Sequence, residues 1–207
     1  MIEPKIFEVR NTIDFKPVWY LKDIIKETAC GYIAGGCFKD IFSGKTPKDY
    51  DIFFYNKHDY NTTAYCIDND VKWHRKYIND KVQAFYNDDG ITIELNRSIF
   101  GQPQKVMEEF DFLLDQVSYA ESETEGQYDL IYHKNFFEDL QMKRLTITKV
   151  SYPLSTFNRA LRYTGYGYNL CLDSKIELAK HIMAFDMPQT DDDIEKAIGG
   201  GLYNGRD

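Results

Sequence analysis

The sequence predicts an α+β fold, in which a mixed sheet with flanking helices is followed by a helical segment. Two observations predict it. Short β-prone runs alternate with turns and short helical patterns up to about residue 133, and beyond it apolar residues recur at helical spacing. The chain has 207 residues, enough to bury a sizeable core without cross-links. We therefore expect one domain over residues 1–133 and a helical segment over residues 134–207.

The first elements follow from apolar spacing and from glycine positions. Apolar side chains recur at helical spacing before Gly31, and Gly35-Gly36 marks a turn directly after a short β-prone run. The elements expected here, in chain order, are a helix over 17–28, a strand over 32–34, a helix over 38–42 and a strand over 49–55.

The middle of the chain predicts a hairpin and further strands. Residues 58–68 are ambiguous, and residues 73–79 fit a helix or a loop. Two β-prone runs flank a turn-rich tetrapeptide that ends in Gly90, which predicts the hairpin. The remaining elements expected are hairpin strands over 82–86 and 91–96, a helix over 104–108, a core strand over 109–119 and an edge strand over 128–132.

Apolar side chains in the last third recur with a helical period. Three groups carry this pattern: Phe136, Phe137 and Leu140; Phe157 and Leu161; and Ile176, Leu178, Ile182 and Met183. This part of the chain is therefore expected to be α-helical.

Composition excludes several classes of protein. A formal net charge of −8 argues against a broad basic surface for nucleic acid. The cysteines Cys30, Cys37, Cys66 and Cys171 lie far apart and form no metal-binding spacing, so neither a zinc site nor a disulfide framework is expected. No apolar run is long enough to span a membrane, and the N-terminus lacks a signal-peptide core. We expect a cytoplasmic protein without a membrane partner.

Two carboxylates stand at alternate positions of the strand expected over 49–55. Asp49 and Asp51 leave the same face of the strand, while Tyr50, Ile52 and Phe54 point to the core. Mg²⁺ prefers oxygen ligands and takes few from the protein, which leaves places for phosphate oxygens. The pair therefore predicts a Mg²⁺ site, with Mn²⁺ as the alternative ion.

Glycines upstream of this pair predict a phosphate-binding turn. Gly35-Gly36 follows a strand and opens a short helix, an arrangement that lets backbone N–H groups approach phosphates. Lys39 follows the turn and is expected to approach the triphosphate of a nucleotide.

A third carboxylate is expected to complete the metal site. Asp111 is the first choice, because Phe110 and Phe112 bury the other face of its predicted strand. Asp115 shares the face of Asp111, and Glu94 in the hairpin is the other alternative.

The segment IAGGCFKDIFSGKTPKDYDIFF resembles the head-domain signature of class II CCA-adding enzymes and bacterial poly(A) polymerases, in the DNA polymerase β superfamily. In that family Gly-Gly-x-x-Arg-Asp precedes Asp-x-Asp. The matching positions are Gly35, Gly36, Lys39, Asp40, Asp49 and Asp51, with Lys in place of Arg. The next family motif, Arg-Arg-Asp-Phe-Thr-Ile-Asn, is similar to FDFLLDQ, where Asp111 and Phe112 match.

NRALRYTGYGY is similar to the neck helix of the same family. The residues in register are Arg159, Arg162, Tyr163, Gly167 and Tyr168. The resemblance implies that Arg159 or Arg162 lies near the base or the triphosphate. Tyr152, Pro153 and Thr156 stand where the family has its base-reading Asp and Arg, so addition of C and then A is not implied. The chain looks like a pared-down head and neck, as expected in a phage or mobile-element genome.

The resemblance implies a polymerase β-like head domain that transfers NMP from an NTP to an acceptor hydroxyl and releases pyrophosphate. The implied acceptor is an RNA 3′ end. Two alternatives stay open: NMP transfer to a protein or a small molecule, and a nucleotide-binding module without turnover.

Overall fold

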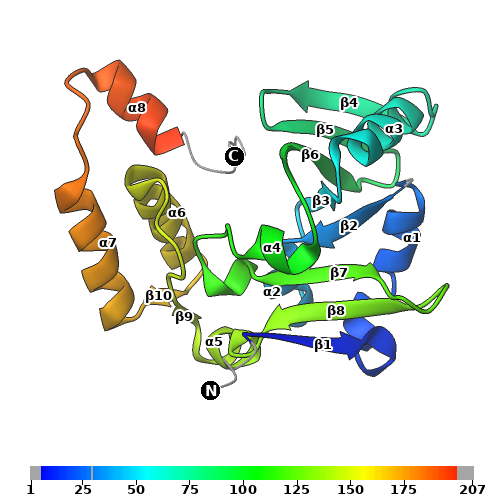
Figure 1. The fold of residues 1–207 in the computed structure, drawn as a ribbon, viewed down its shortest axis with the longest axis horizontal. Coiled ribbons are helices and arrows are strands. Elements are labelled where there is room, and N and C mark those ends of the chain that lie inside the picture. The colour runs from blue at the N-terminus through cyan, green and yellow to red at the C-terminus, as the bar shows by residue number, and fades with distance from the viewer. Residues whose placement is uncertain (1–5, 29, 200–207) are drawn as a thin grey trace. The chain divides into compact units, whose positions relative to one another are not determined.

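The computed structural model describes residues 6–28 and 30–199 (Figure 1). The chain divides into two compact units, which are not consecutive in sequence. The first unit is formed by Met1–Glu108 with Asp115–Lys134, and the second by Glu109–Leu114 with Asn135–Asp207. The short segment Glu109–Leu114 therefore belongs to the second unit, although the first unit surrounds it in sequence.

The first unit is built on an eight-stranded sheet with the order β1-β8-β7-β2-β3-β6-β5-β4. The strands are β1 Phe7–Asn11, β2 Gly31–Ala34, β3 Tyr50–Phe54, β4 Trp73–Ile78, β5 Val82–Asn87, β6 Thr92–Phe100, β7 Val117–Glu121 and β8 Tyr128–His133. Strands β3 and β6 pair in parallel and the other neighbours are antiparallel. The predicted α+β class with a mixed sheet is confirmed.

Short helices connect these strands. They are α1 Leu21–Lys26, α2 Cys37–Phe42, α3 Lys57–Asp68 and α4 Pro103–Met107, with 3₁₀ turns at Thr12–Asp14, Lys16–Val18 and Leu113–Asp115. The ambiguous residues 58–68 form α3, because the side chain of Asn56 accepts a hydrogen bond from the Asp59 N–H at 3.0 Å and caps the helix. The predicted strands 32–34 and 49–55, the short helix at 38–42 and the hairpin are confirmed.

The second unit is mainly helical, as predicted for the end of the chain. Its helices are α5 Phe136–Met142, α6 Pro153–Gly165, α7 Leu172–Ala184 and α8 Asp191–Gly199. Pro153 begins α6, where its missing N–H costs no helical hydrogen bond. Two short strands, β9 Arg144–Leu145 and β10 Asn169–Leu170, pair in parallel.

Three expectations were wrong. Residues 73–78 of the segment 73–79 form the edge strand β4 rather than a helix or loop, and Trp73 alone among the six is buried. The predicted strand 109–119 is a strand only from Val117, because the 3₁₀ turn Leu113–Asp115 interrupts the extended backbone. The strand predicted at the edge, β8, lies inside the sheet, since β1 covers it. Across the described ranges, no helix is long and apolar enough to cross a bilayer.

Candidate active site

The two predicted carboxylates lie at the start of β3. Asp49 directly precedes the strand and Asp51 is its second residue, and both are half-buried. Tyr50 and Ile52 between and after them are buried at 5% and 0% exposure. The strand therefore has the alternation that the sequence predicts, with carboxylates on one face and core residues on the other.

Glu94 is the carboxylate that the sheet brings to this pair. In the parallel pairing of β3 with β6, Asp51 is the register partner of Glu94. Glu94 is 8% exposed. Its pKa is raised mainly by burial and further by the charge of Asp49, while a hydrogen bond from Tyr77 lowers it. Glu94 is therefore the register partner of one carboxylate of the pair and is influenced by the charge of the other.

The pKa of Asp49 is also raised, first of all by burial. The charges of Lys76, Lys39 and Lys48 oppose this rise, with Lys76 the largest of the three effects. Lys76 is exposed and lies on β4, beyond β5 and β6 in the sheet order. This carboxylate cluster is therefore only partly compensated by neighbouring lysines, as expected for a site that binds a cation.

The Gly35-Gly36 turn lies between β2 and α2. Gly35 has φ 104°, a conformation that side-chain-bearing residues rarely adopt. Its N–H donates to the Val117 carbonyl at 3.0 Å, which extends the pairing of β2 with β7. Gly36 is the residue that caps the start of α2, where the first N–H groups have no partner inside the helix. Those groups can face an anionic ligand.

Lys39 lies in α2 and is 8% exposed. Its Nζ donates to Asp40 Oδ2 at 2.8 Å. Its charge lowers the pKa of Asp49, so the lysine acts on the carboxylate pair as well as on its chain neighbour.

Asp111 belongs to the second unit, where it is engaged by α6. Its Oδ2 accepts hydrogen bonds from the Thr156 hydroxyl at 2.7 Å and from the Arg159 guanidinium. The side chains of Asp111 and Arg159 are 4% and 8% exposed. This buried ion pair gives Asp111 a packing role within its unit, and its role as a metal ligand stays a prediction.

The other predicted residues lie on both units. Arg162, on α6, is half-buried. Asp115 belongs to the first unit and is 8% exposed. Tyr77 and Lys76 were not predicted, because β4 was not recognised as a strand and nothing local links either residue to the carboxylates.

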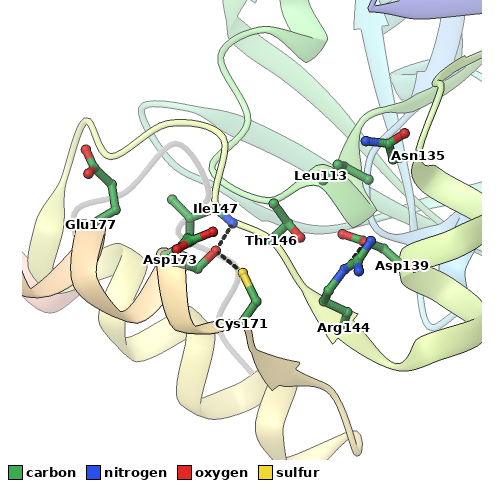
Figure 2. Close-up of a pocket in the computed structure, with 10 residues that line it drawn as sticks. Leu113, Asn135, Asp139, Arg144, Thr146, Ile147, Cys171, Asp173 and Glu177 are labelled. Atoms are coloured by element: carbon green, nitrogen blue, oxygen red, sulfur yellow. Dashed lines mark hydrogen bonds and ion pairs between the residues drawn. The ribbon is translucent and has the colours of Figure 1, made fainter.

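A polar pocket of about 460 Å³ lies within the second unit (Figure 2). Its lining residues are Leu113, Asn135, Asp139, Arg144, Thr146, Ile147, Cys171, Asp173, Ser174 and Glu177. Arg144 Nε donates to the buried Asp139 at 2.5 Å, and the Ile147 N–H donates to Ser174 Oγ at 2.8 Å. These bonds tie α5, the β9 segment and α7 together, and none of the predicted catalytic residues lines the pocket.

The donor set of the first unit suits a small hard cation. Within residues 6–28 and 30–199, no three His, Cys, Asp or Glu side chains already stand together as a metal-binding group. Mg²⁺ is commonly held by one or two carboxylates together with substrate phosphates, and does not need a complete protein cage. Asp49 and Asp51 supply that number of oxygen ligands, and Glu94 adjoins Asp51 in the register.

The fold matches solved structures of CCA-adding enzymes. One in complex with CTP has a TM-score of 0.65 at 14% identity, covering 87% of this chain and 47% of that one. The Thermotoga maritima CCA-adding enzyme complexed with tRNA has a TM-score of 0.58 at 14% identity, covering 97% and 52%. A tRNA nucleotidyltransferase with a primer tRNA and an incoming ATP analog has a TM-score of 0.57 at 17% identity, covering 78% and 49%. The chain thus spans about half the length of these structures.

At the level of sequence, residues 10–143 match the model of a family described as Gabija anti-defense 2 family protein. No curated protein matches the sequence. The family match includes both carboxylates of β3, the Gly35-Gly36 turn and Glu94.

Proposed function

The chain belongs to the Gabija anti-defense 2 family, and we propose that it acts as a metal-dependent nucleotidyltransferase. The reaction is transfer of NMP from an NTP to an acceptor hydroxyl, with release of pyrophosphate. The observation that carries the proposal is the carboxylate pair at the start of β3, joined through the β3–β6 register by Glu94. A polymerase β-like fold that carries this pair favours phosphoryl transfer over nucleotide binding without turnover.

Asp49 and Asp51 would hold Mg²⁺, or Mn²⁺ in its place, and Glu94 is the third carboxylate that we favour. Glu94 lies in the same unit as the pair and Asp51 is its register partner, whereas Asp111 is paired with Arg159 in the other unit. The ion would polarise the phosphate oxygens and favour deprotonation of the attacking hydroxyl. The protein itself contributes positioning and charge, and no covalent intermediate on the protein is needed.

The nucleotide's phosphates would lie against the turn before α2. Backbone N–H groups after Gly35 and Gly36 would bind phosphate oxygens, and Lys39 would neutralise part of their charge. On α6, in the second unit, Arg162 stays our candidate for nucleotide binding, whereas the guanidinium of Arg159 is held by Asp111 within that unit.

The acceptor that we favour is an RNA 3′ hydroxyl, because similar folds occur in complexes with tRNA. The second candidate is a hydroxyl on a protein. Two observations favour it. The net charge of −8 weakens electrostatic binding to the phosphate backbone of RNA. The family description, Gabija anti-defense, also suggests that the target is a protein of the Gabija defence. In either case nucleotidyl transfer would be the chemistry of the counter-defence.

The test is incubation of the purified chain with each α-labelled NTP and Mg²⁺, separately with total RNA and with Gabija proteins. Label that RNase removes identifies an RNA acceptor, and label that protease removes identifies a protein. Asp49→Asn and Asp51→Asn should each abolish the transfer. Asp88→Asn, which changes an exposed carboxylate of the same unit, should retain it. Transfer that survives both β3 substitutions would refute the proposal, and so would the absence of any labelled product.

A further inference from the structure

The edge strand β4 is irregular next to the carboxylate cluster. Its register with β5 runs from Arg75 opposite Phe85 directly to Tyr77 opposite Ala84, so Lys76 is an extra residue in β4. Such a β-bulge twists the strand and changes the direction of a side chain. Figure 1 shows β4 at the end of the sheet, beside β5.

The bulge places Tyr77 on the face of the carboxylates. A regular register would set Lys76 opposite Ala84 and turn Tyr77 to the other face of the sheet. With the bulge, Tyr77 stands opposite Ala84 and its hydroxyl donates to Glu94 Oε1 at 2.5 Å.

A small residue in the strand between them makes this contact possible. Tyr77 pairs with Ala84, Ala84 pairs with Glu94, and Glu94 pairs with Asp51, so these four residues form one row across β4, β5, β6 and β3. Ala84 is fully buried and has no side chain beyond Cβ. The ring of Tyr77 can therefore pass over β5 and reach a carboxylate two strands away.

We propose that Tyr77 is a positioning residue that holds Glu94 in a metal-binding orientation. This inference rests on the proposed function. The hydrogen bond engages one carboxylate oxygen, Oε1, and restricts rotation of the carboxylate, which would leave Oε2 for the ion. One oxygen per carboxylate suits the octahedral geometry of Mg²⁺, whereas two oxygens from one carboxylate suit the larger Ca²⁺. Partners of this kind fix ligand orientation in metal sites generally.

The chain offers a matched control for Tyr77. The hydroxyl of Tyr60, on α3, donates to Gln83 Oε1 at 2.9 Å in the same unit. Tyr60→Phe therefore removes a more deeply buried tyrosine hydrogen bond, whose acceptor is a neutral amide. A purely structural effect of losing a tyrosine hydroxyl would appear in both variants.

The experiment measures Mn²⁺ binding to the full chain without nucleotide, by electron paramagnetic resonance titration. Tyr77→Phe should weaken binding about 10- to 100-fold, and Tyr60→Phe should leave it unchanged. If Tyr77→Phe binds Mn²⁺ as tightly as the unsubstituted chain does, the positioning role of Tyr77 is refuted and the proposed metal site still stands. If Asp49→Asn also binds as the unsubstituted chain does, or if that chain binds no Mn²⁺, the proposed metal site itself is wrong and both proposals fall.

A double-substitution cycle tests whether Tyr77 acts through Glu94. Glu94→Gln removes the ligand, so adding Tyr77→Phe to it should cause no further loss of Mn²⁺ affinity. Losses that multiply would show that Tyr77 acts by another route, and would overturn the proposal. Because Phe and Gln keep the shapes of the original side chains, near-unchanged circular dichroism is expected for all the variants.

Discussion

Replacing Asp111 by Asn separates a structural role from a metal-binding role. The substitution keeps the shape of the side chain and an oxygen that Thr156 can reach, but it leaves the guanidinium of Arg159 without its counter-charge. Both side chains of the pair are less than one-tenth exposed, at 4% and 8%. Breaking a buried pair from one side costs about 3–5 kcal/mol. For a chain of this size, each kcal/mol lowers Tm by about 2–4 °C, so the expected loss is about 6–20 °C.

Differential scanning calorimetry in metal-free buffer measures this loss directly. The double variant Asp111→Asn with Arg159→Met removes both charges and should recover much of the stability, because apolar replacements of buried pairs are often tolerated. If Asp111 is instead mainly a metal ligand, its substitution should change Tm little in metal-free buffer and should abolish Mn²⁺ binding. If Asp111→Asn melts within about 2 °C of the unsubstituted chain but loses Mn²⁺ binding, the ion pair is not its main role, and Asp111 returns as the third carboxylate.

Three further predictions concern single substitutions. Gly35→Ala should lower stability by about 1–3 kcal/mol in urea unfolding because of its φ of 104°. Gly165→Ala, at the last residue of α6 with nothing near its Cβ, should instead raise stability by about 0.4–1 kcal/mol. The raised pKa values of Asp49 and Glu94 mean that the folded state binds more protons than the unfolded one above the ordinary values of 3.8 and 4.5. Their contribution to stability is therefore fully present below those values and is lost as pH rises through the folded pKa values. Glu94→Gln should accordingly raise the free energy of unfolding at pH 7 and flatten its dependence on pH above the ordinary value of 4.5; a steeper dependence would contradict the assignment. Lys76→Met should raise the KM for NTP roughly fivefold, as expected for about 1 kcal/mol from an exposed charge, and an unchanged KM would exclude Lys76 from the site.

Local patterns predict the elements that carry the β3 carboxylates. Strand β3 alternates buried Tyr50 and Ile52 with half-buried Asp49 and Asp51, so its sequence contains the whole signal. The turn before α2 is equally local, since Gly35 has a positive φ that favours glycine. These features are predictable because each depends on residues within a few positions of one another.

Strand β4 could not be predicted in this way. Its six residues include one that is fully buried, Trp73, while four are exposed, because it is an edge strand and the bulge interrupts its alternation. Charged side chains are common on such edges and protect them from pairing with other chains. The period of two that marks a strand is therefore absent from the sequence.

The third carboxylate illustrates a different limit. Asp111 and Glu94 both alternate with apolar residues, and the local pattern ranks Asp111 first because Phe110 and Phe112 flank it. What separates them is pairing between distant segments: Asp51 meets Glu94 through the β3–β6 register, and Asp111 meets Arg159 48 residues later. Register between strands and contacts across a unit depend on packing that no short window of sequence records.

The division of the chain has a consequence for its synthesis on the ribosome. Asp111 and Phe112 belong to the second unit, but they are made before strands β7 and β8 of the first. Arg159 follows Asp111 by 48 residues, which is roughly 2 to 10 s at ordinary translation rates. During that interval Asp111 and Phe112 have been made and Arg159 has not. Strands β7 and β8, which complete the sheet of the first unit, are made in the same interval. The order of translation therefore leaves Asp111 without its ion-pair partner Arg159 until α6 is made.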